Sequence, residues 1–70
     1  MPMVEEKVGQ KIKQIRNEKG LSQEKLALKA EIDRTYLAGV EQGKRNPSIK
    51  SLEKIVEALG ISFQDLFEGI

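Results

Sequence analysis

Arg34, Thr35 and Tyr36 follow Asp33 at the start of an expected short helix, where hydrogen-bonding and cationic side chains take the place of apolar ones. An arginine can donate two parallel hydrogen bonds to O6 and N7 of guanine, and threonine combines a hydroxyl with a methyl group that fits the thymine methyl. Only the first residues of a helix that enters the major groove come near base edges. We therefore expect Arg34 and Thr35 to read bases. Tyr36 is a further candidate for base reading, although a phosphate contact or packing would suit it equally.

Other polar residues have the chemistry to hold the phosphate backbone of DNA. Gln23 lies in the first turn of the preceding expected helix, next to Ser22, where free backbone amides and the helix dipole attract phosphate oxygens. Residues 44–50 contain three cations and no acid, and they follow the helix that carries Arg34. A charged run is often only a solvated loop, but the position of this one beside that helix favours DNA contact. The expected phosphate contacts are Ser22, Gln23, Gly39, Lys44 and Lys50, and Arg45 and Asn46 are expected to reach a base.

The composition limits the kind of protein this chain can be. A chain of 70 residues buries only ~60% of the surface that its unfolded form exposes, which allows one small core and one domain. Because cysteine and histidine are absent, disulfides, thiolate and imidazole metal sites and histidine-dependent triads are excluded, and no cofactor is expected. No apolar run approaches the ~20 residues that cross a bilayer, so we expect a cytoplasmic protein without a membrane partner.

The charge is unevenly distributed along the chain. The formal net charge is only +1, which argues against a polybasic tail. Residues 53–70, however, hold four acids and one lysine, in contrast to the cationic run at 44–50. For DNA binding, the charge of the face that meets DNA matters more than the net charge of the chain. Here the cationic run at 44–50 suits phosphates, whereas the acidic segment 53–70 does not.

Five helices are expected to position these side chains. Val8, Ile12 and Ile15 recur at the spacing of an amphipathic helix in the first of them. Serine or aspartate precedes each later helical segment as a potential N-cap, and glycine follows several of them as a helix terminator. The expected helices span about residues 4–18, 22–30 and 33–42. A fourth is introduced by Pro47-Ser48 and ends at Gly60, a fifth starts at Ser62 ahead of Leu66 and Phe67, and no strand is convincing.

An ordered set of residues runs through these five segments: Arg16, Gly20, Leu21, Ser22, Gln23, Leu26, Ala27, Ile32, Leu37, Val40, Glu41, Gly43, Pro47, Leu52, Leu59, Gly60 and Ile61. The set resembles the helix-turn-helix domain of the phage repressor and Cro type, over nearly the whole chain. This resemblance implies an all-α fold, a compact five-helix bundle of the lambda-repressor-like DNA-binding class, formed by residues 1–70 as a single domain. It also implies a partly buried salt bridge between Arg16 and Glu41, across the first and third helices.

Two residues depart from the usual pattern of that family. Glu31 stands in the turn between the two key helices where relatives often have glycine, and a positive φ there would cost about 1 to 2 kcal/mol. Gly39 lies inside the third helix, where it costs ~1 kcal/mol relative to alanine. Its missing side chain would let the helix approach the groove or the phosphate rim closely, or it would simply mean fewer base contacts.

The C-terminal segment 61–70 carries more apolar side chains than one short helix needs for a small core. We expect Leu66 to pack beneath the fourth helix, which leaves Phe63, Phe67 and Ile70 for a self-complementary contact between two copies. The alternative is that all of them pack within one chain. A dimer is favoured because one DNA-binding module buries only on the order of 600 to 1,000 Å² and rarely supplies genomic specificity alone.

The leading function is a sequence-specific transcriptional regulator that binds double-stranded DNA as a homodimer at a palindromic operator. It would act by occupying a promoter or by helping RNA polymerase there. Within this class, residues 33–36 with 39–41 and 45–46 are similar to the controller proteins of restriction-modification systems, which are small dimers.

Two other function classes remain open at this point. A protein-interaction module, such as an antitoxin or an anti-repressor partner, would bind DNA weakly and with little dependence on salt. An enzyme is the weakest option. Glu53 and Glu57 lie one turn apart on a helix face, but no nucleophile, metal set or phosphate loop accompanies them.

Overall fold

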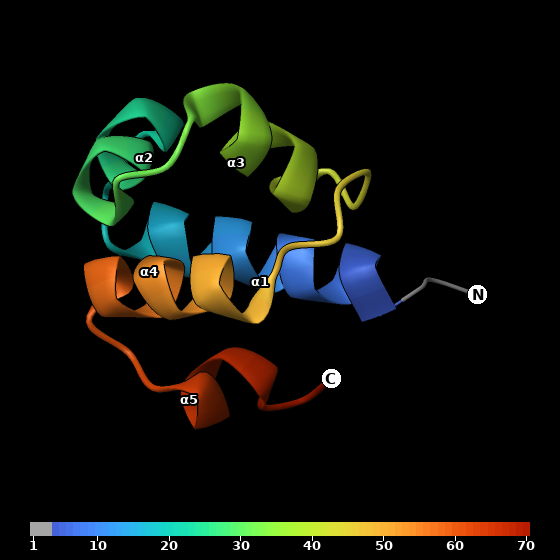
Figure 1. The fold of residues 1–70 in the computed structure, drawn as a ribbon. Helices are drawn as coiled ribbons and strands as arrows, with labels where there is room; N and C mark the ends of the chain where they lie inside the picture. Colours follow the sequence, from blue (N-terminus) through green and yellow to red (C-terminus); the bar gives the residue numbers. More distant parts are fainter. Residues whose placement is uncertain (1–3) are drawn as a thin grey trace.

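The computed structural model describes residues 4–70, and within that range it contains five helices and no strand. The helices are α1 (Val4–Glu18), α2 (Gln23–Ala30), α3 (Arg34–Glu41), α4 (Ile49–Leu59) and α5 (Phe63–Phe67). In the view of Figure 1, α2 and α3 lie on one side of α1 and α4, and α5 lies on the other. The predicted all-α five-helix fold is confirmed. Residues 1–3 of the expected domain lie outside the described residues.

Polar caps set the start of each helix after α1. The side chains of Ser22, Asp33, Ser48 and Ser62 each accept a hydrogen bond from the backbone amide three residues further along, at 3.1 to 3.2 Å. Each cap pairs an amide that the helix itself leaves without a partner. Because this chemistry is local, the predicted helix starts agree with the observed ones.

The core is one cluster of apolar side chains drawn from all five helices. α3 packs on α1, α2 packs on α4, and α5 contacts both α1 and α4. The predicted core residues Leu37, Val40 and Leu66 are fully buried. The other members of the cluster are Val8, Ile12, Ile15, Leu26, Ala27, Ala30, Leu52, Ile55, Val56 and Leu59. None of the helices formed by residues 4–70 combines the length and apolar character that crossing a bilayer requires.

Glu31 closes α2 in a left-handed conformation, with φ of 57° and ψ of 44°. Its amide donates to the carbonyl of Leu28 at 3.2 Å, and the amide of Ile32 donates to the carbonyl of Ala27 at 3.0 Å. These two bonds form a Schellman motif, in which the residue after the helix normally is glycine. The positive φ whose cost the sequence analysis considered is therefore present, and a glutamate bears its strain.

Gly9, in the middle of α1, is a fold determinant that the sequence interpretation overlooked. A Cβ atom at Gly9 would overlap the carbonyl oxygen of Val40 and lie 2.9 Å from that of Glu41. The end of α3 can therefore press against the α1 backbone only because this residue has no side chain. One signal was available, since Gly9 stands three residues before Ile12 and so on the buried stripe of α1.

Candidate nucleic-acid interface

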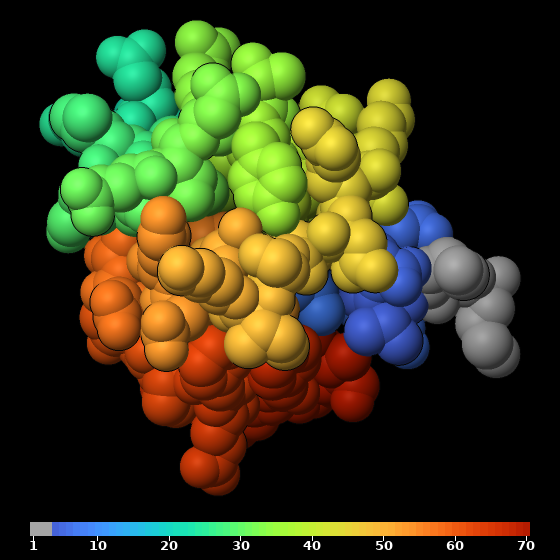
Figure 2. Space-filling view, in the orientation of Figure 1, coloured from blue at the N-terminus to red at the C-terminus, as the bar shows by residue number. Residues whose placement is uncertain are grey.

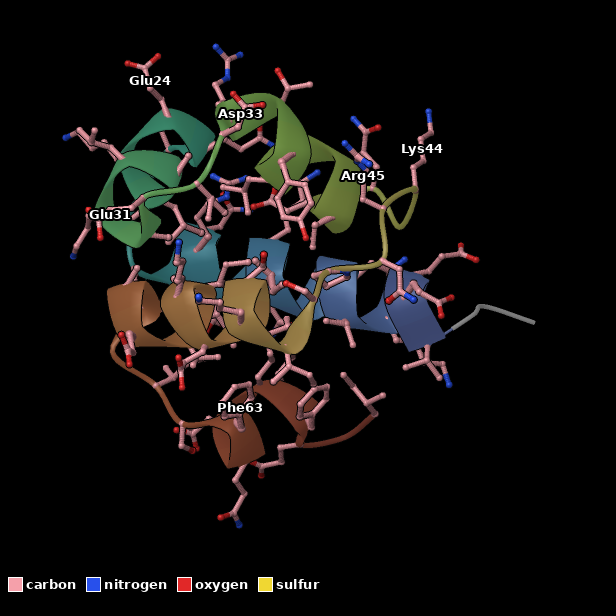
Figure 3. All side chains as sticks on the ribbon, viewed as in Figure 1. Glu24, Glu31, Asp33, Lys44, Arg45 and Phe63 are labelled. Atoms are coloured by element: carbon pink, nitrogen blue, oxygen red, sulfur yellow. The ribbon has the colours of Figure 1, made fainter. Side chains whose placement is uncertain are left out.

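The beginning of α3 carries the two expected base readers on the outside of the molecule. The side chains of Arg34 and Thr35 are exposed, while Leu37 and Val40 on the same helix are fully buried. Figure 3 shows Asp33 at this helix start, with Lys44 and Arg45 on the same side of the molecule. α3 is thus held by its apolar side and offers its polar N-terminal end to a ligand, which is the geometry that a helix in a major groove requires.

A polar hollow of about 450 Å³ separates the start of α2 from the start of α3. Its lining includes Ser22 and Gln23 from the beginning of α2 and Arg34 from the beginning of α3, with Arg16 of α1 and Glu24 completing it. The structure therefore brings two expected phosphate contacts and one expected base contact to one place. We call Ser22, Gln23, Arg34, Thr35, Lys44 and Arg45 the polar face.

Beneath the polar face lies an ion pair between Arg16 and Glu41. Arg16 Nε donates to Glu41 Oε2 at 2.8 Å, and Arg16 Nη2 donates to Glu41 Oε1 at 3.0 Å. The side chains are only 9% and 1% exposed, respectively. The remaining terminal nitrogen, Arg16 Nη1, donates to the Leu21 carbonyl at 2.8 Å. The pair implied by the family resemblance is present, and it ties α1 both to α3 and to the turn before α2.

Gln23 takes part in the same buried arrangement. Its Nε2 atom donates to Glu41 Oε1 at 3.0 Å, so one carboxylate orients side chains from both α1 and α2. The bond to Glu41 adds a partner to the phosphate contact expected of Gln23. The amide keeps a second N–H and a carbonyl oxygen, so the bond to Glu41 orients the group and leaves it capable of donating elsewhere. A phosphate contact by Gln23 stays a prediction.

Tyr36 differs from the two residues before it because it is half-buried and packs against the core. Its hydroxyl accepts a hydrogen bond from the Ser48 amide at 3.4 Å, and the Arg45 guanidinium lies over its ring, 5.4 Å from the centroid. Tyr36 thereby links α3 to the start of α4. Of the roles left open by the sequence, packing is present in the structure, and base reading stays a prediction.

The connection between α3 and α4 carries the remaining expected DNA contacts. Lys44, Arg45, Asn46 and Lys50 are all exposed. The backbone amides of Lys44 and Arg45 donate to the Gly39 carbonyl at 2.9 and 3.1 Å, which holds the beginning of the connection on α3. The open side of Gly39 is occupied by the Arg45 side chain. The phosphate contact expected of Gly39 stays a prediction, and the neighbour of this glycine within the chain is Arg45.

The opposite side of the molecule exposes apolar side chains. Phe63, Phe67 and Ile70 are 37%, 40% and 42% exposed, and the two phenylalanine rings stack with centroids 6.4 Å apart. Val4 and Ile49, which the sequence interpretation overlooked, line an apolar hollow of about 200 Å³ together with Phe67. Figure 2 shows the beginnings of α1 and α4 near the C-terminal end of the chain on one side of the molecule. We call Val4, Ile49, Phe63, Phe67 and Ile70 the apolar face.

Comparison with known proteins gives a consistent result. A helix-turn-helix family model matches residues 12–66. The chain is 49% identical to the control protein C.MunI of a Mycoplasma species, over 89% of this chain and 85% of that protein. It is 48% identical to the control protein C.BamHI of Bacillus amyloliquefaciens, over 86% and 75%. The restriction-modification controller protein C.Esp1396I, solved as a tetramer in complex with its natural 35-base-pair operator, superposes with a TM-score of 0.88 at 47% identity, covering 97% of this chain and 90% of that one.

Proposed function

The chain belongs to the helix-turn-helix family, close to the restriction-modification controller proteins, and we propose that it acts as a homodimer on a palindromic operator. It is a DNA-binding transcriptional regulator rather than an enzyme. Residues 1–70 form its single DNA-binding domain, with helix-turn-helix segments at 22–30 and 33–42 and a dimerisation segment at 61–70. The operator lies at the promoter of genes in a restriction-modification system. The dimer blocks that promoter or assists RNA polymerase there.

The polar face is the observation that carries this proposal. Arg34 and Thr35 stand exposed at the N-terminal end of α3, and Gln23 from α2 shares a hollow with Arg34. The bond from Gln23 to Glu41 and the bidentate pair with Arg16 hold these helices in one relative position. A preorganised set of donors loses less conformational entropy when it meets DNA.

The apolar face supports the dimer. Full burial of an exposed phenylalanine side chain contributes about 1.5 to 3 kcal/mol. Phe63 and Phe67 are 37% and 40% exposed, so each ring can add a fraction of that, and two copies of both rings would be covered at once. A twofold axis through this face makes the contact self-complementary, because each copy offers the same apolar side chains to the other. The tetrameric state of C.Esp1396I on its operator is consistent with assembly from such pairs.

The test is a selection of the purified protein against a pool of randomised DNA duplexes at physiological salt, followed by sequencing of the retained fraction. The expected result is an inverted repeat with half-sites about one helical turn apart. An Arg34→Ala variant, carried through the same selection, is expected to lose enrichment at one or two positions of each half-site. A single half-site without a repeat would contradict the dimer.

Retention of no sequence above background would contradict specific DNA binding and favour the protein-interaction module. A salt titration on the selected duplex separates the two functions further. For a DNA-binding protein, the logarithm of the binding constant falls with the logarithm of salt concentration, with a slope of about −0.9 per neutralised phosphate. A nearly flat dependence would mean that phosphate contacts are absent.

A further inference from the structure

We propose that Gly39 is a positioning residue for operator recognition, because its missing side chain leaves the space in which Arg45 lies along α3 and over Tyr36. The inference rests on the proposed function together with the base contact that the sequence predicts for Arg45. Gly39 itself touches no base in this arrangement. It determines the direction in which the Arg45 guanidinium is presented.

The space beside Gly39 is filled by the Cβ and Cγ atoms of Arg45. A Cβ atom added at position 39 would lie 2.6 Å from Arg45 Cγ, 3.4 Å from its Cβ and 3.9 Å from its Cδ. Unlike the flexible tip of a long side chain, Cγ can move away only by a change of χ1 or by a shift of the backbone. Any side chain at position 39 therefore forces Arg45 into another rotamer or displaces the connection between α3 and α4.

The backbone next to Arg45 is tied to the same glycine. The Gly39 carbonyl accepts hydrogen bonds from the amides of Lys44 and Arg45 at 2.9 and 3.1 Å. A shift of the connection away from α3 would weaken both bonds. The less costly response to a Cβ at position 39 is therefore a rotation of the Arg45 side chain away from α3.

That rotation would remove Arg45 from Tyr36. The guanidinium carbon lies 5.4 Å from the centre of the Tyr36 ring, within the range of a cation–π contact. The tyrosine is itself held by packing on the core and by the hydrogen bond from the Ser48 amide. An arginine held against a fixed ring has lost part of its rotamer freedom before DNA arrives, so less entropy is lost on binding.

Because Gly39 lies inside α3, a structural role and a positioning role predict different effects of Gly39→Ala. A glycine in a helix interior is less favourable than alanine, so alanine should be preferred there if the site had no other role. A purely structural effect of Gly39→Ala would change the melting temperature and leave the preference for operator over unrelated DNA intact. A positioning effect lowers that preference through Arg45.

The experiment compares wild type, Gly39→Ala, Arg45→Ala and the double variant, using the selected operator and a scrambled duplex of equal length at one salt concentration. We expect Arg45→Ala to lower the ratio of the two binding constants by about tenfold. Gly39→Ala is expected to lower it by about fivefold in the wild-type background and by less than twofold in the Arg45→Ala background, because coupled residues are not additive. As a matched control, Gly39→Ala in an Arg34→Ala background should keep its full fivefold effect.

The outcomes distinguish this inference from the function on which it rests. If Arg45→Ala leaves the ratio unchanged, Arg45 does not read the operator, and both the proposed base contact and the role of Gly39 are wrong. If Arg45→Ala lowers the ratio but Gly39→Ala does not, the base contact stands and the inference is overturned. The inference is also overturned if Gly39→Ala has an undiminished effect in the double variant.

A second measurement keeps the inference testable if Gly39→Ala folds poorly. Removal of Arg45 Cγ relieves the contact with a Cβ at position 39, so the double variant should recover the melting temperature of Arg45→Ala. If the double variant remains as unstable as Gly39→Ala, the clash lies elsewhere and the inference fails. In a folded Gly39→Ala protein, the ring-current shift of the Arg45 Cδ protons from Tyr36 should disappear from the NMR spectrum, and its persistence would contradict the proposed displacement.

Discussion

The polar face and the apolar face lie on opposite sides of the same small core, and they are held in different ways. The polar face contains exposed cations and hydroxyls and the half-buried amide of Gln23, and it rests on a buried bidentate ion pair between Arg16 and Glu41. The apolar face is anchored by one fully buried residue, Leu66, while Phe63 and Phe67 remain more than a third exposed. Figure 3 shows this separation, with Lys44 and Arg45 far from Phe63.

The difference shows which face depends on a partner for its stability and which does not. The hydrogen bonds that orient Gln23 and Arg16 are made inside the monomer, so the polar face is ready for a ligand before it binds one. The exposed phenylalanines gain their hydrophobic free energy only when another surface covers them. Hydrogen bonds made inside the monomer therefore indicate that the polar face is a recognition surface. The exposed phenylalanine rings indicate that the apolar face is a surface for assembly.

Removal of the internal support should have the largest effect. Glu41→Ala leaves the Arg16 guanidinium buried without its partner and releases Gln23, and we expect a loss of about 3 to 5 kcal/mol in the free energy of unfolding. Chemical denaturation measures this loss. Glu41→Gln, which keeps the shape and one acceptor, is the matched control and should lose less. A loss below about 1 kcal/mol for Glu41→Ala would mean that the pair does not support the polar face.

A charge on the apolar face should separate the two copies. Phe67→Glu is expected to weaken dimerisation by about 1.5 to 3 kcal/mol, or more than tenfold in the dissociation constant, because it removes apolar area from the contact. Sedimentation equilibrium measures the change. Leu28→Glu alters a side chain that is 78% exposed on α2, away from this face, and should leave the association unchanged. Equal weakening by both substitutions would place the dimer contact elsewhere.

Substitutions within the polar face should separate base reading from phosphate holding. Arg34→Ala is expected to cost about 1 to 3 kcal/mol on the preferred operator and much less on random DNA. Gln23→Ala is expected to weaken binding to all sequences alike, because a phosphate carries no sequence information. Fluorescence anisotropy on the two duplexes measures both effects. Equal losses on specific and random DNA for Arg34→Ala would remove its assignment as a base reader.

Relief of the strain at Glu31 should stabilise the domain without changing recognition. Its φ of 57° favours glycine, and Glu31→Gly is expected to raise the free energy of unfolding by about 1 kcal/mol. Thermal melting provides the measurement, and the affinity for the operator should stay constant. Glu31→Ala, which keeps a Cβ, is the control and should give little gain. A decrease in stability for Glu31→Gly would show that the glutamate side chain has a stabilising contact.

The smallest effect on stability is expected from lowering the pH until Asp65 of α5 becomes protonated. Hydrogen bonds from the Ser62 backbone and side chain lower the pKa of Asp65 below its ordinary value of 3.8. Because the folded-state pKa is the lower one, ionised Asp65 stabilises the helix above the unfolded pKa, and this contribution is lost as the pH falls through the folded pKa. A pH titration of thermal stability should show a small additional loss below pH 3.8 that is absent from Asp65→Asn. Identical profiles for the two proteins would contradict the role of this capping box.

The local chemistry of the chain determined where its helices begin. Ser22, Asp33, Ser48 and Ser62 accept hydrogen bonds from amides three residues away, so their effect depends on neighbours in sequence and could be predicted. The amphipathic stripes likewise predicted the buried residues and the polar start of α3. The turn position of Glu31 likewise raised the question of a positive φ, which the structure answers with a left-handed conformation.

Tertiary structure alone decided how those elements support one another. The bond from Gln23 to Glu41 joins residues 18 positions apart, and the close approach of α3 to α1 at Gly9 likewise joins segments far apart in sequence. The same holds for Gly39, whose open side becomes the place of Arg45 once the connection to α4 folds back. Short-range hydrogen bonds and side-chain periodicity are contained in the order of residues, whereas the distance between two helix backbones depends on the packing of all five helices.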